Sequence, residues 1–573
     1  MEQFADLWTA EGAALRGQPW PEYPRPSLRR DSFFNLNGPW DFCEKPDGQG
    51  PEAYPEIITV PFPPESLLSG IHRTFAPGTA LYYRKRFRLP EGFSGKRVLL
   101  HFGAADQEAE ITLNGILLGR HRGGYEGFSF DVTEALRPEN ELVVRITDPQ
   151  DGGCLPYGKQ RRRRGGMWYT PVSGLWQTVW MEAVPEDYIR SLRFTAAGDR
   201  VTLTIQGPTE GFLRVKTPAG LVEVPISEGK AELILNSPRF WSPEEPYLYE
   251  AEIETAQDRV QSYFALRTLE TKIVDGLPRL CLNGKPYFFH GVLDQGYWCD
   301  GLFTPAGPDC FDRDIAAMKD LGFNTLRKHI KVEPELFYYA CDRLGMVVFQ
   351  DMVNSGKYSF LRDTALPTLG LQHRKDRRLH RNAETRRAFR QAMEETVAAL
   401  DCHPSVCCWT IFNEGWGQFD GTAQYEALKE LDPTRFVDTA SGWFRGPKSD
   451  VESVHVYFKP VKLPKSSLPL VLSEFGGYAH RVPGHHFNLT KNYGYRTYES
   501  REALMDGLEV LYRREILSAR DRGLCAAIYT QLSDVEDETN GLLTFDRRVC
   551  KVDKGRMQAI GRALARNIPT NQL

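Results

Sequence analysis

The second half of the sequence alternates short apolar runs with segments of helical periodicity, and this alternation most restricts the possible fold. After residue 285 helical stretches such as 312–321, 334–344, 384–400 and 503–522 separate the apolar runs. Buried parallel strands covered by helices have this pattern. Eight strand-helix units in about 290 residues predict a (β/α)8 barrel, since a doubly wound sheet usually has fewer strands. The predicted strands begin at Tyr287, Thr325, Val347, Val406, Phe436, Val454, Leu470 and Ala526.

The first half instead alternates polar and apolar residues in short runs bounded by Gly, Pro and Asn. A period of two predicts β-strands. The pair Asn114-Gly115, which separates two such runs, predicts a tight hairpin because a type I′ turn needs positive φ at both central residues. Residues 33–183 therefore predict an all-β sandwich, and residues 188–268 predict a second, immunoglobulin-like sandwich.

The length supports several domains. A chain of 573 residues exceeds the roughly 250 to 300 residues at which single hydrophobic cores stop growing. We predict a β-sandwich over residues 1–185, an immunoglobulin-like sandwich over 186–270 and a barrel over 271–573.

Composition excludes some classes of protein. The hydrophobic share of 41% is ordinary, and no run approaches the ~20 apolar residues that span a bilayer. The N-terminus lacks a basic region followed by an apolar one, so we expect a cytoplasmic protein that does not contact membranes. The 11 cysteines form no CxxC pair, which favours reduced thiols and predicts no metal site.

The charge distribution argues against nucleic-acid binding. The net charge is −4 and the pI is near 6.4, which provides no field that would attract a polyanion. Two basic clusters, Arg161–Arg164 and residues 373–381, fit solvated loops or salt bridges in an oligomer, with binding of phosphates or an acidic substrate as the alternative. Neither GxGxxG nor GxxxxGK[ST] occurs, and no cofactor is expected.

Two glutamates occupy the ends of predicted barrel strands. Glu414 follows the fourth strand and Glu474 follows the apolar run of the seventh. Chemistry in such barrels takes place where strands end and loops begin. Two neighbouring, partly desolvated carboxylates disfavour double ionisation, so one acts as an acid and the other as a base. A carboxyl separation of about 5 to 5.5 Å would give retention of configuration and roughly 6.5 to 9.5 Å inversion, and the sequence does not distinguish the two.

The chain resembles glycoside hydrolase family 2, the family of β-galactosidases, β-glucuronidases and β-mannosidases, over nearly its whole length. Asn413-Glu414 and Ser473-Glu474-Phe-Gly are two of the matching motifs. The others are Asn37-Gly-Pro-Trp-Asp-Phe, Tyr82-Tyr-Arg-Lys-Arg-Phe, Thr112-Leu-Asn-Gly, Ser173-Gly-Leu-Trp-Gln-Thr-Val-Trp, Leu282-Asn-Gly-Lys-Pro and Phe323-Asn-Thr-Leu-Arg-Lys-His.

The resemblance implies a sugar-binding jelly roll as the first domain, and a retaining mechanism in which Glu414 is the acid/base and Glu474 the nucleophile. It further implies that Asn413 bonds the sugar 2-hydroxyl and that Tyr457 orients the nucleophile. Arg327 and His329 would keep the nucleophile ionised and contact sugar hydroxyls.

Three further residues are expected at the sugar subsite, because a pyranose needs hydrogen-bond partners and an apolar platform. They are Asp294, Trp298 and Asp351. Two of them have a named alternative role: loop packing for Trp298, and a helix cap or an ion pair with Arg327 for Asp351.

The substrate is less well defined than the reaction. Gly165-Gly166 stands where several family members have an acidic residue, and the Asn-x-Lys motif of many glucuronidases is not evident after the eighth strand. We expect an exo-β-glycosidase for small oligosaccharides or aryl glycosides, β-galactosidase first and β-glucuronidase second. A catalytically inactive carbohydrate-binding homologue and a nucleic-acid-binding protein are the alternatives. Short members of the family commonly associate, so a homo-oligomer fits, but no symmetry is specified.

Overall fold

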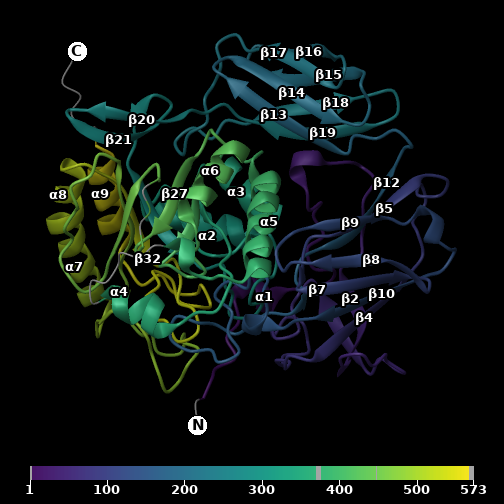
Figure 1. The fold of residues 1–573 in the computed structure, drawn as a ribbon, viewed down its shortest axis with the longest axis horizontal. Coiled ribbons are helices and arrows are strands. Elements are labelled where there is room, and N and C mark those ends of the chain that lie inside the picture. The colour runs from purple at the N-terminus through teal and green to yellow at the C-terminus, as the bar shows by residue number, and fades with distance from the viewer. Residues whose placement is uncertain (1–2, 369–375, 445, 447, 567–573) are drawn as a thin grey trace.

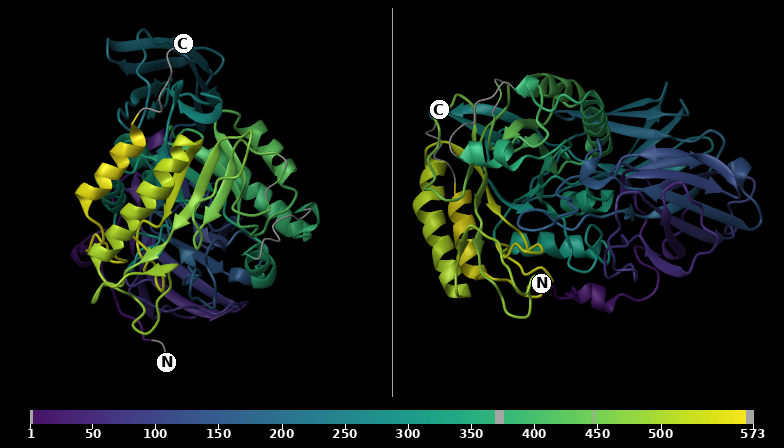
Figure 2. Two further views of the ribbon diagram at one scale, coloured as in Figure 1. Left: turned by 90° about the vertical axis from the view of Figure 1, so that its left-hand side faces the viewer. Right: turned by 60° about the horizontal axis from the view of Figure 1, so that its bottom comes forward.

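Three parts make up the computed structural model, which describes residues 3–368, 376–444, 446 and 448–566. In Figure 1 the barrel, coloured green and yellow with its surrounding helices, lies beside a purple-to-blue β-sandwich, and a second sandwich covers both from above. In the right-hand view of Figure 2 the first sandwich and the C-terminal helices lie at opposite ends of the molecule. The barrel therefore has one side packed against the first sandwich.

Two antiparallel sheets form the first sandwich, in the strand orders β1-β12-β5-β9 and β3-β2-β4-β10-β7-β8. Their facing sides enclose one hydrophobic core. Strand β10 shows why, since the buried Leu142, Val144 and Ile146 alternate with half-buried residues along the strand. The strands are β1 (Phe34–Asn35), β2 (Gly38–Pro46), β3 (Glu56–Val60), β4 (Thr79–Phe87), β5 (Arg97–Phe102), β7 (Glu108–Leu113), β8 (Ile116–Arg122), β9 (Phe128–Asp131), β10 (Asn140–Thr147) and β12 (Val179–Val184).

The predicted hairpin joins β7 to β8. Asn114 has φ of 53° and Gly115 φ of 80°, the left-handed backbone that a type I′ turn requires at both positions. The Nδ2 atom of Asn114 also donates to the carbonyl oxygen of Ala135 at 2.8 Å, which ties the turn to the rest of the domain.

The second sandwich is smaller and packs a core of its own. It has a three-stranded sheet, β13-β14-β17, and a four-stranded sheet, β16-β15-β18-β19. These strands are β13 (Ser191–Ala197), β14 (Arg200–Gln206), β15 (Gly211–Thr217), β16 (Gly220–Ile226), β17 (Lys230–Ile234), β18 (Tyr249–Glu254) and β19 (Arg259–Phe264). A short antiparallel sheet of β20 (Leu269–Val274), β21 (Leu277–Leu282) and β22 (Lys285–Pro286) leads from it to the barrel.

Eight parallel strands form the barrel in the order β27-β26-β25-β24-β23-β32-β29-β28, which confirms the predicted fold class. The strands β25 and β26 are buried at every residue, as the apolar runs predicted. The barrel strands are β23 (Phe289–Asp294), β24 (Thr325–Lys328), β25 (Val347–Asp351), β26 (Val406–Asn413), β27 (Phe436–Ser441), β28 (Glu452–Val456), β29 (Leu470–Gly476) and β32 (Leu524–Thr530).

Amphipathic helices cover the outside of the barrel. Their apolar sides join one large core that continues into the loops at the barrel mouth. The longer helical elements are α2 (Asp309–Asp320), α3 (Glu335–Leu344), α5 (Ala383–Leu400), α6 (Gly421–Leu431), α7 (Arg501–Leu511), the π-helical segment Tyr512–Ile516, α8 (Leu517–Asp521) and α9 (Lys554–Ala565). Within the described residues no helix is long and apolar enough to cross a membrane.

The seam of the barrel lies between β27 and β28, the two ends of the strand order, and side chains connect it. The Oγ atom of Ser441 on β27 lies 3.4 Å from Oγ of Ser453 and 2.8 Å from Nε2 of His455, both on β28. Ser441 also donates to Oγ of Ser473 on β29 at 2.8 Å. A hydroxyl network thus links three strands directly beneath one side of the mouth.

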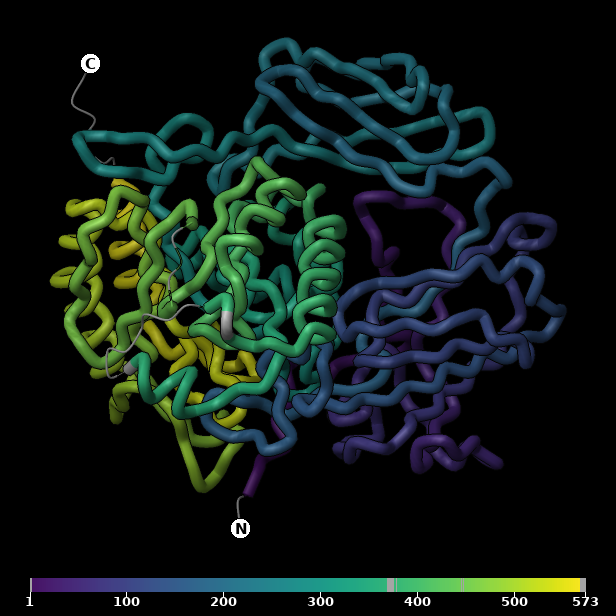
Figure 3. Tube along the Cα trace, viewed as in Figure 1, coloured from purple at the N-terminus to yellow at the C-terminus, as the bar shows by residue number. Residues whose placement is uncertain are grey.

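A loop of the first domain reaches the barrel mouth. Figure 3 shows this blue segment next to the yellow loops that follow β32. Arg164 on the loop contacts Oε2 of Glu536 and Oδ1 of Asp537, each at 3.0 Å, and Arg161 pairs with Asp151 at 3.2 Å. The arginine run is therefore partly used in ion pairs within the chain. Of the other basic cluster, residues 373–375 lie outside the described residues.

Candidate active site

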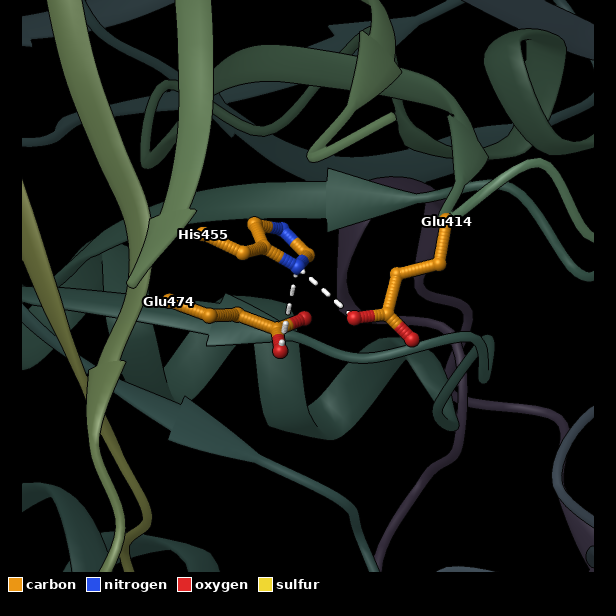
Figure 4. A group of neighbouring side chains, drawn as sticks. All are labelled: Glu414, His455 and Glu474. Atoms are coloured by element: carbon orange, nitrogen blue, oxygen red, sulfur yellow. Dashed lines mark hydrogen bonds and ion pairs between the residues drawn. The ribbon is translucent and has the colours of Figure 1, made fainter. Parts of the chain in front are cut away.

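Glu414 and Glu474 stand at the same end of the barrel. Glu414 comes directly after β26, and Glu474 lies near the end of β29. Their side chains are 13% and 6% exposed. Figure 4 shows the two carboxylates facing each other, and an oxygen of one lies within 4.8 Å of an oxygen of the other. The two carboxylates therefore lie close enough to act on one small ligand.

The backbone aims Glu414 into the mouth. Its φ of 50° lies in the left-handed region, which a residue with a side chain adopts at a cost of about 1 to 2 kcal/mol. The N–H group of Glu414 donates to the carbonyl oxygen of Ser441 at 2.9 Å. Gly415 continues the turn with φ of 74°, and a Cβ there would lie 2.2 Å from the ring of Phe444. Only glycine fits behind this glutamate.

Arg327 connects several of the residues predicted from the sequence. Its Nη1 donates to Oε1 of Glu474 at 3.1 Å, its Nε to Oδ1 of Asp351 at 2.9 Å, and its Nη2 to Oδ1 of Asn413 at 2.8 Å. The ion pair with Asp351 is the alternative that the sequence left open for that residue. The buried Nδ2 atom of Asn413 has no hydrogen-bond partner within the described ranges, so a sugar hydroxyl would satisfy it.

Glu474 is held as a carboxylate. Burial opposes its ionisation, but the neighbouring His455, the charge of Arg327 and a short hydrogen bond from the Tyr457 hydroxyl outweigh burial and lower its pKa to about 2. The hydroxyl of Tyr457 also lies 3.0 Å from Oγ1 of Thr530. An ionised carboxylate at neutral pH is the state that a nucleophile requires.

His329 is a neutral partner at the same rim. Burial lowers its pKa to about 4 and the charge of Lys159 also lowers it, although a hydrogen bond to the Asp351 carboxylate raises it. Its Nδ1 lies 2.7 Å from Oδ2 of Asp351. A neutral ring that donates from Nδ1 leaves Nε2 as an acceptor for a hydroxyl.

His455 is a member of the site that the sequence analysis missed. Its side chain is fully buried, and Nδ1 lies 2.9 Å from Oε1 of Glu414 and 3.5 Å from Oε2 of Glu474 (Figure 4). The sequence contained a signal for this position. His455 precedes Tyr457 by two residues, and alternate residues of a strand share one side. These three donor groups also suit a divalent transition metal, which would block both carboxylates if it bound there.

Asp294 and Trp298 have other contacts. Within the described part of the chain, the carboxylate of Asp294 contacts Nζ of Lys328 and, at 2.9 Å, the N–H group of Gly296. Trp298 is 3% exposed and lies under the guanidinium of Arg547, 4.2 Å from its ring centroid. The structure places neither side chain in the network around Glu474, and their predicted role at the sugar subsite stays a prediction.

The first domain supplies polar groups that sequence reasoning did not assign to the site. Tyr169 donates its hydroxyl hydrogen to Oε2 of Glu538 at 3.1 Å. Nζ of Lys159 lies 5.7 Å from the ring centroid of Tyr169 and 5.2 Å from that of Trp416, which is two residues beyond Glu414. The expectation that Gly165-Gly166 leaves this domain without a carboxylate at the substrate does not exclude other contacts from it.

Family comparisons agree with this architecture. The family model described as "Glycosyl hydrolases family 2, TIM barrel domain" matches residues 273–480. The one described as "Glycosyl hydrolase 2 galactose-binding domain-like" matches residues 74–165, and "Glycosyl hydrolases family 2" matches residues 193–267. The barrel, its paired carboxylates and these family matches together define a glycoside hydrolase. The chain belongs to glycoside hydrolase family 2, as the motifs indicated.

Individual relatives are distant. A β-glucuronidase of Streptococcus agalactiae is 25% identical over 452 residues, which is 72% of each chain. A β-galactosidase of Thermoanaerobacter pseudethanolicus is 26% identical over 299 residues, which is 47% of this chain and 39% of that protein. The chain thus matches less than half the length of the latter enzyme, and 61% of a Bacteroides fragilis β-glucuronidase that is 22% identical.

Solved structures share the fold. A β-D-glucuronidase of Dictyoglomus thermophilum superposes with a TM-score of 0.73 at 18% identity, over 96% of this chain and 99% of that one. A β-glucuronidase of Ruminococcus gnavus gives 0.71 at 18% identity over 95% and 100%. Most of these relatives are named as glucuronidases, so the expectation of a β-galactosidase type is not favoured.

Proposed function

We propose that the protein is a retaining exo-β-glycosidase that works by double displacement. The observation that carries this proposal is the separation of Glu414 and Glu474, whose nearest oxygens lie within 4.8 Å. At that distance both carboxylates reach one anomeric carbon and its leaving oxygen.

In the first step an oxygen of Glu474 bonds to the anomeric carbon while the bond to the aglycone oxygen breaks, and Glu414 donates its proton to that oxygen. In the second step Glu414 takes a proton from water, the water oxygen bonds to the anomeric carbon, and the bond to Glu474 breaks. Two inversions return the original configuration.

The surrounding residues support these roles. Arg327 and Tyr457 bind the two oxygens of Glu474, which keeps the carboxylate ionised and oriented. Asn413 presents a free amide donor beside them, where the 2-hydroxyl of the sugar would lie. His455 contacts Glu414 and fixes its position opposite the nucleophile.

A β-glucuronidase is the more specific candidate that the names of the relatives favour. A panel of nitrophenyl glycosides tests both the proposed β-glycosidase activity and the β-glucuronidase candidate. Release of nitrophenol from at least one β-glycoside, with a β-anomer as the first product by NMR, is expected. Turnover of α-glycosides alone, or a first product of inverted configuration, would contradict the proposal.

A further inference from the structure

Three serine hydroxyls lead from His455 into the barrel and form what we call the hydroxyl relay. The side chain of His455 is fully buried, and its Nε2 atom lies 2.8 Å from Oγ of Ser441. Ser441 donates to Oγ of Ser473 at 2.8 Å, and Oγ of Ser473 lies 2.6 Å from Oγ of Ser453. Ser453 in turn hydrogen-bonds the side chain of Asp438. The relay therefore joins the imidazole to a carboxylate inside the barrel.

Asp438 is the acceptor at the inner end of the relay. It lies on β27 and is 4% exposed. Burial raises its pKa to about 6 and the charge of Asp351 also raises it, whereas the hydrogen bond from Ser453 and the charge of Arg327 lower it. The carboxylate is therefore ionised at neutral pH, and it accepts hydrogen bonds without donating any. With Arg327 and Ser473 it lines a void of about 10 Å³, which has room for no more than one water molecule.

This acceptor fixes the direction of every hydrogen bond in the relay. Because a hydroxyl has one hydrogen, Ser453 donates to Asp438 and has to accept from Ser473. A contact of 3.3 Å from the Ser473 hydroxyl to a backbone carbonyl oxygen also points its hydrogen away from Ser441. Ser441 gives its own hydrogen to Ser473, so it accepts from Nε2 of His455. Nε2 therefore carries a hydrogen.

A hydrogen on Nε2 determines what His455 offers to Glu414. Nδ1 of His455 and Oε1 of Glu414 lie 2.9 Å apart, and two acceptors at that distance repel each other. One more hydrogen therefore lies between them, on Nδ1 or on Oε1. If the relay ran the other way, Ser441 would donate to Nε2, and a neutral ring with its hydrogen on Nδ1 would stabilise Glu414 as a carboxylate. The direction set by Asp438 gives the pair of His455 and Glu414 one additional proton.

We propose that Asp438 is a positioning residue that keeps the acid/base Glu414 supplied with its proton through the hydroxyl relay and His455. The proposal rests on the function proposed above and adds a residue to its mechanism. The proton held between His455 and Glu414 is the one that passes to the aglycone oxygen in the first step. The proton that Glu414 takes from water in the second step restores it. Asp438 acts through other side chains and donates no proton itself.

Other titratable groups near the pair do not supply this proton. Nδ1 of His455 also lies 3.5 Å from Oε2 of Glu474, but that carboxylate is ionised. Asp438 attracts a positive charge on His455, which favours the same number of protons. Four tyrosines act electrostatically with Glu414, and burial raises the pKa of each, so they are uncharged near neutral pH. They are Tyr358, Tyr457, Tyr493 and Tyr495.

Kinetics across the pH range test the proposal. An amide donates as well as accepts, so Asp438→Asn lets the relay reverse, and Ser453→Ala interrupts it. In both variants the alkaline limb of kcat/KM for an alkyl β-glycoside, which needs the acid, should move to lower pH by about 1 unit. That shift is a loss of about 10-fold in kcat/KM above the limb. A dinitrophenyl glycoside, whose leaving group needs no proton, should be nearly unaffected.

Matched variants separate this role from a general loss of structure. Asp450 accepts a hydrogen bond from the N–H group of Val437 on the same strand and is not part of the relay, so Asp450→Asn should leave the limb in place. The double variant Asp438→Asn/Ser453→Ala should shift the limb no further than Ser453→Ala alone, because both changes act on one relay. Thermal unfolding of every variant excludes misfolding as the cause.

Neutron diffraction observes the hydrogens directly and does not depend on activity. At neutral pH it should find deuterium on Nε2 of His455 and the hydroxyl of Ser441 directed at Ser473. An Nε2 atom without deuterium would overturn this inference while leaving the proposed function intact.

Two kinetic results would also overturn the inference. One is an alkaline limb in both Asp438→Asn and Ser453→Ala that coincides with the limb of the Asp450→Asn control. The other is an equal shift for the alkyl and dinitrophenyl glycosides. Failure to turn over any β-glycoside would instead overturn the proposed function and, with it, the catalytic role of Asp438.

Discussion

The Nδ1 atom of His455 lies 2.9 Å from Oε1 of Glu414. This contact joins β28 to the turn after β26 across the seam of the barrel, where β27 and β28 close without a backbone ladder. The other ring nitrogen, Nε2, lies 2.8 Å from the hydroxyl of Ser441. The imidazole is therefore fixed at both ends, and it holds the proposed acid/base opposite Glu474.

Replacing His455 should misplace the acid/base. We expect His455→Asn to lower kcat by about 10- to 100-fold with a much smaller change in KM, because a shift of about 1 Å in a catalytic group costs that much. The pH profile of kcat should also move, which a purely structural role would not cause. His485→Asn, which removes a histidine-carboxylate pair with Asp546 outside the site, is the control. Equal pH profiles for both variants would contradict the positioning role.

Removing the acid/base should leave activated substrates reactive. Glu414→Ala should lower kcat/KM for substrates with poor leaving groups by about 10²- to 10⁴-fold, since general acid catalysis supplies a factor of that size. Dinitrophenyl glycosides need no protonation and should still glycosylate Glu474. Azide, which attacks without a general base, should then restore turnover and yield a β-glycosyl azide. An α-azide, or no rescue, would count against the role of Glu414.

Tyr457 should control the acid limb of the pH profile. Its hydroxyl lowers the pKa of Glu474, which burial alone would raise. Tyr457→Phe removes this hydrogen bond, so the pKa of Glu474 rises. The nucleophile then stays protonated and inactive up to a higher pH. We expect the acid limb of kcat/KM to move upward by about 1 pH unit or more. Tyr425 on α6 donates its hydroxyl hydrogen to the carboxylate of Asp450, and Tyr425→Phe, which removes this contact, should leave the limb in place.

The ion pairs of Arg164 should affect substrate binding. Its guanidinium bridges Glu536 and Asp537 and so anchors the first-domain loop that carries Tyr169 beside the mouth. Arg164→Lys keeps the charge but not the forked geometry. We expect KM to rise by about 3- to 10-fold while kcat changes less. The measurement is steady-state kinetics on the best β-glycoside, and an unchanged KM would show that the loop is held by other contacts.

Periodicity was enough to predict the barrel. All eight predicted strands are present; seven are buried at every residue and β28 alternates between buried and half-buried positions. The bounds of β25 and β26 match the runs that begin at Val347 and Val406. The Asn114-Gly115 hairpin followed from backbone sterics alone. The limits proposed for the three domains stay predictions.

Pairings across the barrel were harder to predict. The register of β23 and β24 sets Asp294 opposite Lys328, and the two side chains pair; the role of Asp294 at the sugar subsite stays a prediction. A sequence pattern gives the strands and not their register. Tyr169 and Glu538 are 369 residues apart, so their contact depends on how the first domain docks, which no local signal contains. His455, in contrast, could have been predicted from the two-residue period that it shares with Tyr457.

The proposed covalent intermediate on Glu474 gives the most direct test of this account. A dinitrophenyl 2-deoxy-2-fluoro-β-glycoside of the best sugar should inactivate the enzyme, because fluorine slows both formation and hydrolysis of the intermediate while the activated leaving group keeps formation fast, so that the intermediate accumulates. Mass spectrometry of the digested protein should then find one sugar on the peptide that contains Glu474. A label on Glu414 or on another residue, or normal turnover without any label and with an inverted product, would contradict the account.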